Sequence, residues 1–212
     1  MRLDHVSYAA QPDGLRATAA RLGAALGVAP VDGGVHPRFG TRNMVLPIAD
    51  GRYVEVVEVL DHPASDKAAF GQAVRARSAA GGGWVCWVVE VDDLAPFEER
   101  IGHDSVPGNR HRPDGVELRW RQIGVKGLVV DPQLPYMIRW ETPPELHPSV
   151  GGAPDVVLTG LEIAGDPELV RSWLGLAPDY TSQDLDVRYV TPEDAPHLSK
   201  VTFSTPNGNI EL

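Results

Sequence analysis

The most constraining feature of this sequence is a repeated order of secondary-structure elements. Three stretches, at residues 1–61, 82–143 and 155–212, each predict a strand, a helix and then further extended segments. Residues 62–81, between the first two stretches, predict a linker helix. With 22 Gly and 19 Pro in 212 residues, the elements should be short and the turns many. The sequence therefore predicts an α+β fold built from repeated β-α-β-β-β (βαβββ) modules.

The first module shows the pattern most clearly. Side chains of residues 3–9 alternate between two faces of a predicted strand, with Leu3 and His5 on one face and Asp4 on the other. Apolar residues at helical spacing predict a helix over residues 15–26. A strand, a tight turn and a second strand then complete the module.

The second and third modules repeat this order with shorter helices. Asp93 and Asp166 are the expected N-cap residues, because an aspartate there accepts hydrogen bonds from the free N–H groups of the first turn. Residues 102–113 predict an exposed loop in which Arg110 is solvated. The extended segments expected over the whole chain are residues 3–9, 41–48, 52–60, 84–91, 116–123, 134–140, 156–163, 187–190, 198–204 and 209–212.

Composition argues against several classes of partner. The formal net charge is −10, whereas proteins that bind nucleic acids or anionic membranes usually carry a basic excess. No apolar run approaches the roughly 20 residues that span a bilayer, and the N-terminus does not look like a signal peptide. The single Cys86 cannot form an internal disulfide. We therefore expect a cytoplasmic protein that acts on a small molecule, with no nucleic acid and no membrane as partner.

Three segments, in this order, resemble the vicinal oxygen chelate superfamily, in its glyoxalase-like branch. They are Leu-Asp-His-Val at residues 3–6, Gly-Gly-Val-His-Pro-Arg-Phe-Gly-Thr-Arg-Asn at residues 33–43, and Gly-Arg-Tyr-Val-Glu-Val at residues 51–56. The superfamily includes glyoxalase I, extradiol dioxygenases and bleomycin-resistance proteins. The resemblance implies that each module forms a half-open barrel and that two modules pair to enclose a site. In metal-binding members, the first strand of a module gives one ligand and the last strand gives a carboxylate.

His5 and Glu55 occupy these two ligand positions in the first module. In the third module, Glu211 occupies the carboxylate position, and in the second module Arg139 does. If the first and third modules pair, His5, Glu55 and Glu211 form a site for a divalent metal such as Zn, Mn, Ni or Fe. If the first and second modules pair, Arg139 makes the pocket an anion-binding site. The alternative without a metal is that His5 and Glu55 form a hydrogen-bonded pair.

Other side chains are candidates for catalysis and for substrate binding. Glu211 or Glu162 is a candidate base for proton transfer beside an enediolate-like intermediate. The resemblance places the segment that holds His36 and Asn43 near the mouth of the site, so these residues are expected, together with Arg139, to bind the substrate. The alternative for His36 is a solvated turn.

These residues support two main functions. The first is a glyoxalase-like, metal-dependent enzyme that performs isomerase- or lyase-type proton transfer on a small substrate with vicinal oxygens. The second is a metal-free protein that binds or sequesters a small molecule, as bleomycin-resistance proteins do. A module used only for assembly is a third reading. An odd number of modules leaves one apolar sheet face unpaired, which predicts a homodimer.

Overall fold

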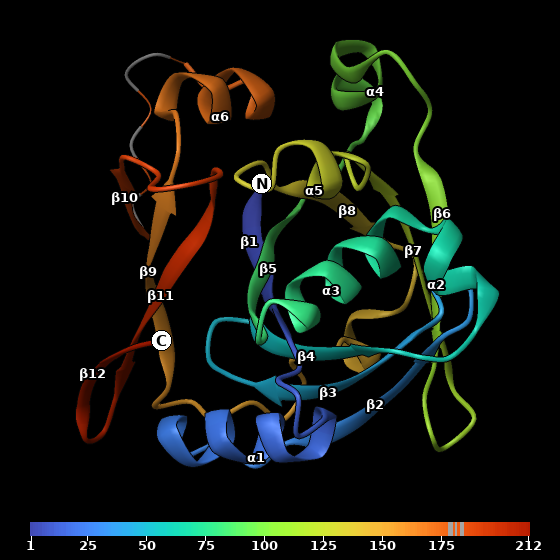
Figure 1. Cartoon of the computed structure of the whole chain (residues 1–212), viewed down its shortest axis with the longest axis vertical. Coiled ribbons are helices and arrows are strands. Elements are labelled where there is room, and N and C mark those ends of the chain that lie inside the picture. The colour runs from blue at the N-terminus through green and yellow to red at the C-terminus, as the bar shows by residue number, and fades with distance from the viewer. Residues whose placement is uncertain (178–179, 181, 183–184) are drawn as a thin grey trace.

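The computed structural model describes residues 1–177, 180, 182 and 185–212. Two groups of four strands are followed by a third group, and each group contains a helix (Figure 1). The strands are β1 Arg2–Ala9, β2 Val31–His36, β3 Thr41–Pro47, β4 Tyr53–Val59, β5 Gly83–Glu90, β6 Val106–His111, β7 Glu117–Ile123, β8 Tyr136–Trp140, β9 Val157–Ala164, β10 Asp186–Val190, β11 His197–Thr205 and β12 Gly208–Glu211. The helices are α1 Leu15–Leu26, α2 Pro63–Lys67, α3 Ala69–Ala79, α4 Ala95–Ile101, α5 Gly127–Val130, the 3-10 helix η1 Pro144–Leu146 and α6 Pro167–Leu174.

The first two groups of strands close into one barrel, in the order β1-β4-β3-β2-β6-β7-β8-β5. In each group the first and last strands are parallel neighbours, β1 beside β4 and β5 beside β8. The antiparallel pairs β1–β5 and β2–β6 join the two groups. The predicted α+β fold with repeated βαβββ modules is therefore confirmed, and the first module pairs with the second.

Strand β1 departs from the strict alternation predicted for residues 3–9. Its register against β5 shifts between Leu3 and His5, so Asp4 is the extra residue of a β-bulge. Because of this bulge, Leu3 and Val6 both pack into the apolar core outside the barrel, while the side chains of Asp4 and His5 meet each other. The prediction that Leu3 shares a face with His5 is wrong for this reason.

The exposed loop predicted for residues 102–113 is also wrong, because strand β6 lies within it. β6 pairs with β7 along its length, and both Gly108 and Arg110 are buried. A Cβ atom at Gly108 would lie 2.3 Å from the Trp120 ring, so glycine makes room for this indole. With a glycine and an arginine at its buried positions, β6 lacks the apolar alternation that identifies a strand.

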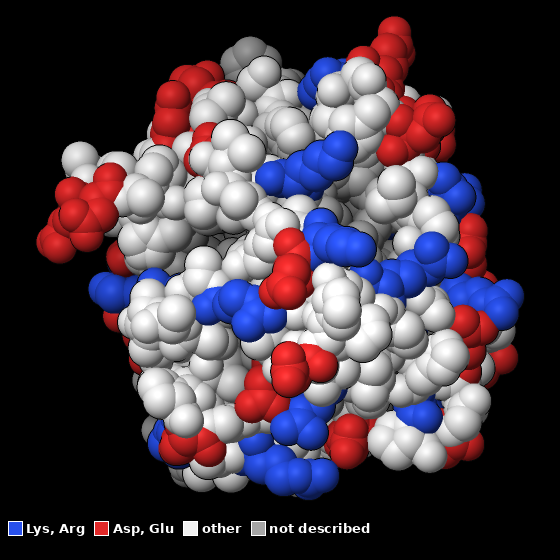
Figure 2. All heavy atoms as spheres, turned by 45° about the vertical axis from the view of Figure 1, so that its right-hand side comes forward, with Lys and Arg blue, Asp and Glu red and all other residues white. Residues whose placement is uncertain are grey.

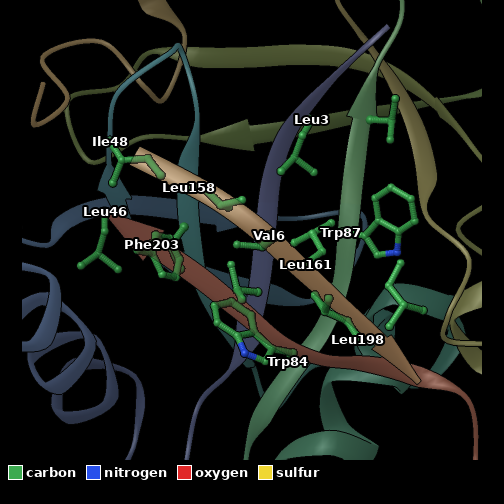
Figure 3. Packing of buried hydrophobic residues seen from close by; sticks show 14 of the residues in the cluster. Leu3, Val6, Leu46, Ile48, Trp84, Trp87, Leu158, Leu161, Leu198 and Phe203 are labelled. Carbon is green, nitrogen blue, oxygen red and sulfur yellow. The ribbon is translucent and has the colours of Figure 1, made fainter. Parts of the chain in front are cut away.

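The third module forms a separate sheet with the order β10-β9-β11-β12. Its elements follow the predicted sequence order, but β9 has β10 as its parallel neighbour and β12 lies at the edge. Figure 3 shows its apolar side chains, among them Leu161 and Phe203, packed against Val6 and Trp84 on the outer face of β1 and β5. The apolar face that motivated the expected homodimer is thus covered within the chain.

Helices complete the surroundings of the barrel. Helix α1 packs on β3 and β4, and α3 packs against β4, β5 and α5 (Figure 1). α3 lies in the segment predicted as a linker helix, and its Phe70 lines the barrel cavity. On the face shown in Figure 2, Lys and Arg side chains are interspersed with Asp and Glu, without one large patch of either sign. Among the described residues, no helix has the length and apolar character needed to cross a bilayer.

Candidate functional site

The barrel encloses a narrow cavity with a free volume of about 20 Å³. Polar side chains from strands of both modules converge on it, and aromatic rings form much of its wall. Such a mixture of apolar wall and a few polar groups is typical of small-molecule sites. The lining residues are His5, His36, Phe39, Tyr53, Glu55, Phe70, Arg110, Trp120, Gln122, Val125, Tyr136, Ile138 and Trp140.

His5 is held in the cavity by a buried carboxylate. Its Nδ1 atom lies 2.7 Å from Oδ2 of Asp4, the bulged residue beside it. The imidazole stacks on the ring of Tyr53, with centroids 4.4 Å apart and an interplanar angle of 15°. These two contacts fix the ring, and in the described part of the chain its Nε2 atom has no hydrogen-bond partner.

Asp4 is fully buried and has further partners. Its Oδ1 atom lies 3.0 Å from Nε2 of His147 and accepts a hydrogen bond of 3.3 Å from Nε1 of Trp140. Burial alone would raise the pKa of Asp4, but its contacts with His147 and His5 outweigh burial and hold the pKa well below its usual range. Asp4 is therefore a carboxylate at neutral pH, and it favours the His5 tautomer with hydrogen on Nδ1.

Glu55, on β4, has both oxygens occupied. Ser7 Oγ donates to Oε2 at 2.6 Å, and Asn43 Nδ2 donates to Oε1 at 2.7 Å. Nε2 of His36 lies 3.6 Å from the same Oε1. Burial raises the pKa of Glu55, but electrostatic interactions with His36 and His5 and the two hydrogen bonds outweigh it, so the pKa is lowered. Glu55 is a fixed negative charge and a poor proton acceptor.

His36 and Arg110 are buried on neighbouring strands. Nδ1 of His36 lies 3.0 Å from Oγ1 of Thr41, and burial lowers the pKa of His36 to about 4, so the ring is neutral at pH 7. Arg110 is only 4% exposed, and burial lowers the pKa of its guanidinium as well. The solvated turn considered for His36 is not what the structure shows.

Several residues expected at the site do meet there. His5, Glu55 and His36 line one cavity, and Asn43 lies behind them as a donor to Glu55. The alternative in which His5 and Glu55 bond directly is not found, because Nδ1 of His5 is on Asp4.

Arg139 points away from the cavity. Its side chain is 43% exposed and lies 3.8 Å from Glu141. Ile138 and Trp140, which flank Arg139 on β8, line the cavity. Because side chains alternate along a strand, Arg139 points to the opposite face. The cation that faces the cavity is Arg110 instead.

Glu211 and Glu162 lie on the second sheet and do not reach the cavity. Both face Arg188 and Lys200 in a charged cluster at the surface of that sheet. The expected position of Glu211 assumed that its strand lies beside β9, but β12 pairs only with β11. His5, Glu55 and Glu211 are therefore not brought together.

The donor set in the cavity does not fit a divalent metal. The side chains that the second module brings to the cavity, among them Tyr136 and Ile138, are not usual ligands of a divalent metal, and the oxygens of Glu55 are already hydrogen-bonded. Within the described ranges, no group of three or more His, Cys, Asp or Glu side chains is arranged to hold a metal ion. The positive charge of Arg110 in the same cavity also opposes a cation.

Two residues of this site were not identified as functional from the sequence. Arg110 was assigned to a solvated loop, and His147 comes from the segment after β8, 143 residues from its partner Asp4. No local pattern indicates such a distant contact. The bulge in β1, which lets Asp4 meet His5, likewise has no signal in the alternation of apolar residues.

Fold and site define a barrel of paired βαβββ modules that encloses a buried cavity lined by polar and aromatic side chains. A family model described as a glyoxalase-like domain matches residues 3–176. The chain therefore belongs to the glyoxalase-like domain family, within the vicinal oxygen chelate superfamily, as the resemblance implied.

One solved structure shows the same fold over nearly the whole chain. A hypothetical protein from Staphylococcus aureus is similar over 99% of this chain and 84% of that chain, with 12% identity and a TM-score of 0.62. Methylmalonyl-CoA epimerase from Mycobacterium tuberculosis matches 68% of this chain and 90% of that chain, with 18% identity and a TM-score of 0.46. No curated protein matches.

Proposed function

We propose that the barrel cavity catalyses isomerase- or lyase-type proton transfer on a small substrate with vicinal oxygens, with His5 as the general base. The observation that carries this proposal is the 2.7 Å contact between His5 Nδ1 and the Asp4 carboxylate. A carboxylate on one imidazole nitrogen fixes the tautomer and supports the imidazolium that forms when the other nitrogen accepts a proton. That other nitrogen, Nε2, belongs to a ring that lines the cavity.

The reaction is balanced without any further reagent. Nε2 of His5 removes a proton from a substrate carbon, and the electron pair moves onto the adjacent carbonyl oxygen to give an enediolate. Return of the proton to the former carbonyl carbon, with transfer of the hydroxyl proton from one oxygen to the other, completes an isomerisation. Loss of a leaving group with its bonding pair from the carbon β to the carbonyl instead re-forms the carbonyl and completes an elimination. Glu55 supports the imidazolium electrostatically, and its lowered pKa makes it a poor proton acceptor.

We propose chemistry without a metal, in place of the expected divalent ion on His5, Glu55 and Glu211, because the donors of the cavity are already bonded to one another. A metal-free binding or sequestration protein is the second candidate, and the observation in its favour is the buried cation Arg110, which suits an anionic ligand without turnover. A homodimer and a cytoplasmic location stay predictions.

Hydrogen exchange tests the proposal. Small 2-oxo and 2-hydroxy carbonyl compounds are incubated with the protein in D₂O, and loss of the α-proton signal is followed by proton NMR. We expect His5→Gln to slow exchange by about 100-fold or more, the usual contribution of a general base. Arg139→Gln, a polar substitution outside the cavity, is the matched control and should keep the wild-type rate.

Three results would count against this mechanism. Exchange by His5→Gln at the wild-type rate would remove His5 as the base. Loss of exchange in EDTA, with recovery on adding Zn, Mn, Ni or Fe(II), would restore the metal-dependent alternative. Absence of exchange across the compounds, combined with tight binding of one of them, would favour the sequestration function.

A further inference from the structure

The cavity contains a buried cation without a protein counterpart. Arg110 is 4% exposed, and among the described residues its guanidinium has no hydrogen-bond or ion-pair partner. Arg52 is buried to a similar extent, yet its Nη1 donates to the carbonyl of Leu158 at 3.1 Å. Arg121 donates to Ser105 at 2.9 Å. Of the two arginines that are buried among the described residues, Arg52 thus has a protein partner and Arg110 has none.

An unpaired buried charge is costly, because it has lost its water without gaining a partner. The negative charges nearest to Arg110 do not remove this cost. Glu55 accepts from Ser7 and Asn43, and Asp4 is bonded by His5 and His147. The structure therefore retains donors in the cavity that only a molecule from outside can satisfy.

The position of Arg110 suits a substrate of the proposed site. β6 and β1 lie on opposite sides of the barrel, four strands apart in the ring, and Arg110 and His5 line the same cavity. Gln122 adds a neutral donor on this side of the cavity. Its Oε1 accepts a hydrogen bond from Trp120 Nε1 at 2.7 Å, so its amide nitrogen remains available to donate to a ligand. A molecule in the cavity thus lies between a base and a cation.

We propose that Arg110 binds a carboxylate of the substrate, or the two vicinal oxygens of its enediolate, and so supplies here the positive charge that a metal supplies in metal-binding members. A guanidinium presents two parallel N–H donors that match a carboxylate or an oxygen pair. This inference names the substrate class, a small 2-oxo or 2-hydroxy acid, and rests on the proposed function. Anion binding is nevertheless measurable without turnover.

Oxalate is the probe, because it carries vicinal oxygens and resembles a planar enediolate. Binding is measured by calorimetry, and thermal unfolding is followed with and without oxalate in EDTA. We expect oxalate to raise the Tm of the wild type, and Arg110→Met to weaken oxalate binding at least tenfold. The affinity of Arg110→Lys for oxalate should lie between those of the wild type and Arg110→Met, because lysine keeps the positive charge but lacks the two parallel N–H donors of the guanidinium. Arg139→Met, with the same change in net charge on an exposed side chain, should bind as the wild type does.

A second measurement separates binding from folding. Without oxalate, Arg110→Met should unfold at the same or a higher temperature than the wild type, because it removes an unpaired buried charge. Oxalate binding that survives in Arg110→Met, or a wild type whose Tm does not respond to oxalate, would overturn the inference. His5→Gln should lose hydrogen exchange and keep oxalate binding. Exchange that persists in His5→Gln would therefore refute the proposed function while leaving this inference standing.

Discussion

At the scale of single residues, His36 links the buried cavity to the pH dependence of stability. Burial lowers its pKa from 6.5 to about 4, and the negative charge of Glu55 opposes this only in part. The unfolded chain takes up a proton here as pH falls through 6.5, whereas the folded protein does so only near pH 4. Acidification through this window therefore favours unfolding, by at most about 3 kcal/mol at about 1.4 kcal/mol per pKa unit.

We expect His36→Gln to unfold with less dependence on pH than the wild type, in urea titrations at about pH 7 and about pH 5. The buried carboxylates Asp4 and Glu55 act outside this window. Their pKa values are lowered, so the stability they contribute is lost only below the pKa of an unfolded carboxyl group. His103→Gln, an exposed substitution, is the control. An equal pH dependence in His36→Gln and wild type would contradict the expectation.

Residues of the site were predictable where they lie within the three segments that carry the family resemblance. His5, Glu55 and His36 were identified in this way, and they do meet in one cavity. Arg110 was not, because its strand has no apolar alternation, and His147 was not, because its contact with Asp4 depends on tertiary folding. Side chains that complete a site from distant segments leave no local periodicity to read.

At the scale of elements, the packing of β2 on β3 positions the Glu55 network. A Cβ atom at Gly33 would lie 2.1 Å from Oδ1 of Asn43, so Gly33→Ala must displace this side chain from Glu55. We expect a loss of about 1–3 kcal/mol of unfolding free energy, the usual cost of leaving a buried polar group without its partner.

A double-mutant cycle checks this route. If Gly33→Ala acts through Asn43, it should lower the unfolding free energy much less in the Asn43→Ala background than in the wild type. Gly127→Ala is the matched control, because a Cβ there meets nothing within 4 Å. Simple additivity of the two substitutions would show that the glycine is needed for another reason.

Elements with runs of apolar and β-branched residues, such as β4 and β5, were predicted, and so was the order of elements in each module. The order of strands in the third sheet was not. Which strand pairs with β9 is decided by contacts between segments far apart in the sequence, and the element order is compatible with more than one pairing. The position expected for Glu211 depended on that choice.

At the scale of the whole molecule, the second sheet and the barrel share one core across β1. Leu3 and Val6 of this strand pack with Phe203 of the second sheet, while its Asp4 and His5 face each other beside the cavity. Nε1 of Trp84 also donates to the carbonyl of Leu212 at 2.8 Å. The third module therefore packs against the outer face of the strand that carries the proposed base.

This shared core predicts that the barrel and the second sheet unfold together. Phe203→Ala should lower the unfolding free energy by about 3–5 kcal/mol, as expected for truncating a fully buried phenylalanine. Circular dichroism and tryptophan fluorescence should report one coincident transition in wild type and variant. Val190→Ala, on an exposed position of the same sheet, should change stability little. Two separate transitions, with the barrel unaffected by Phe203→Ala, would show instead that the third module is an independent unit and that β1 does not depend on it.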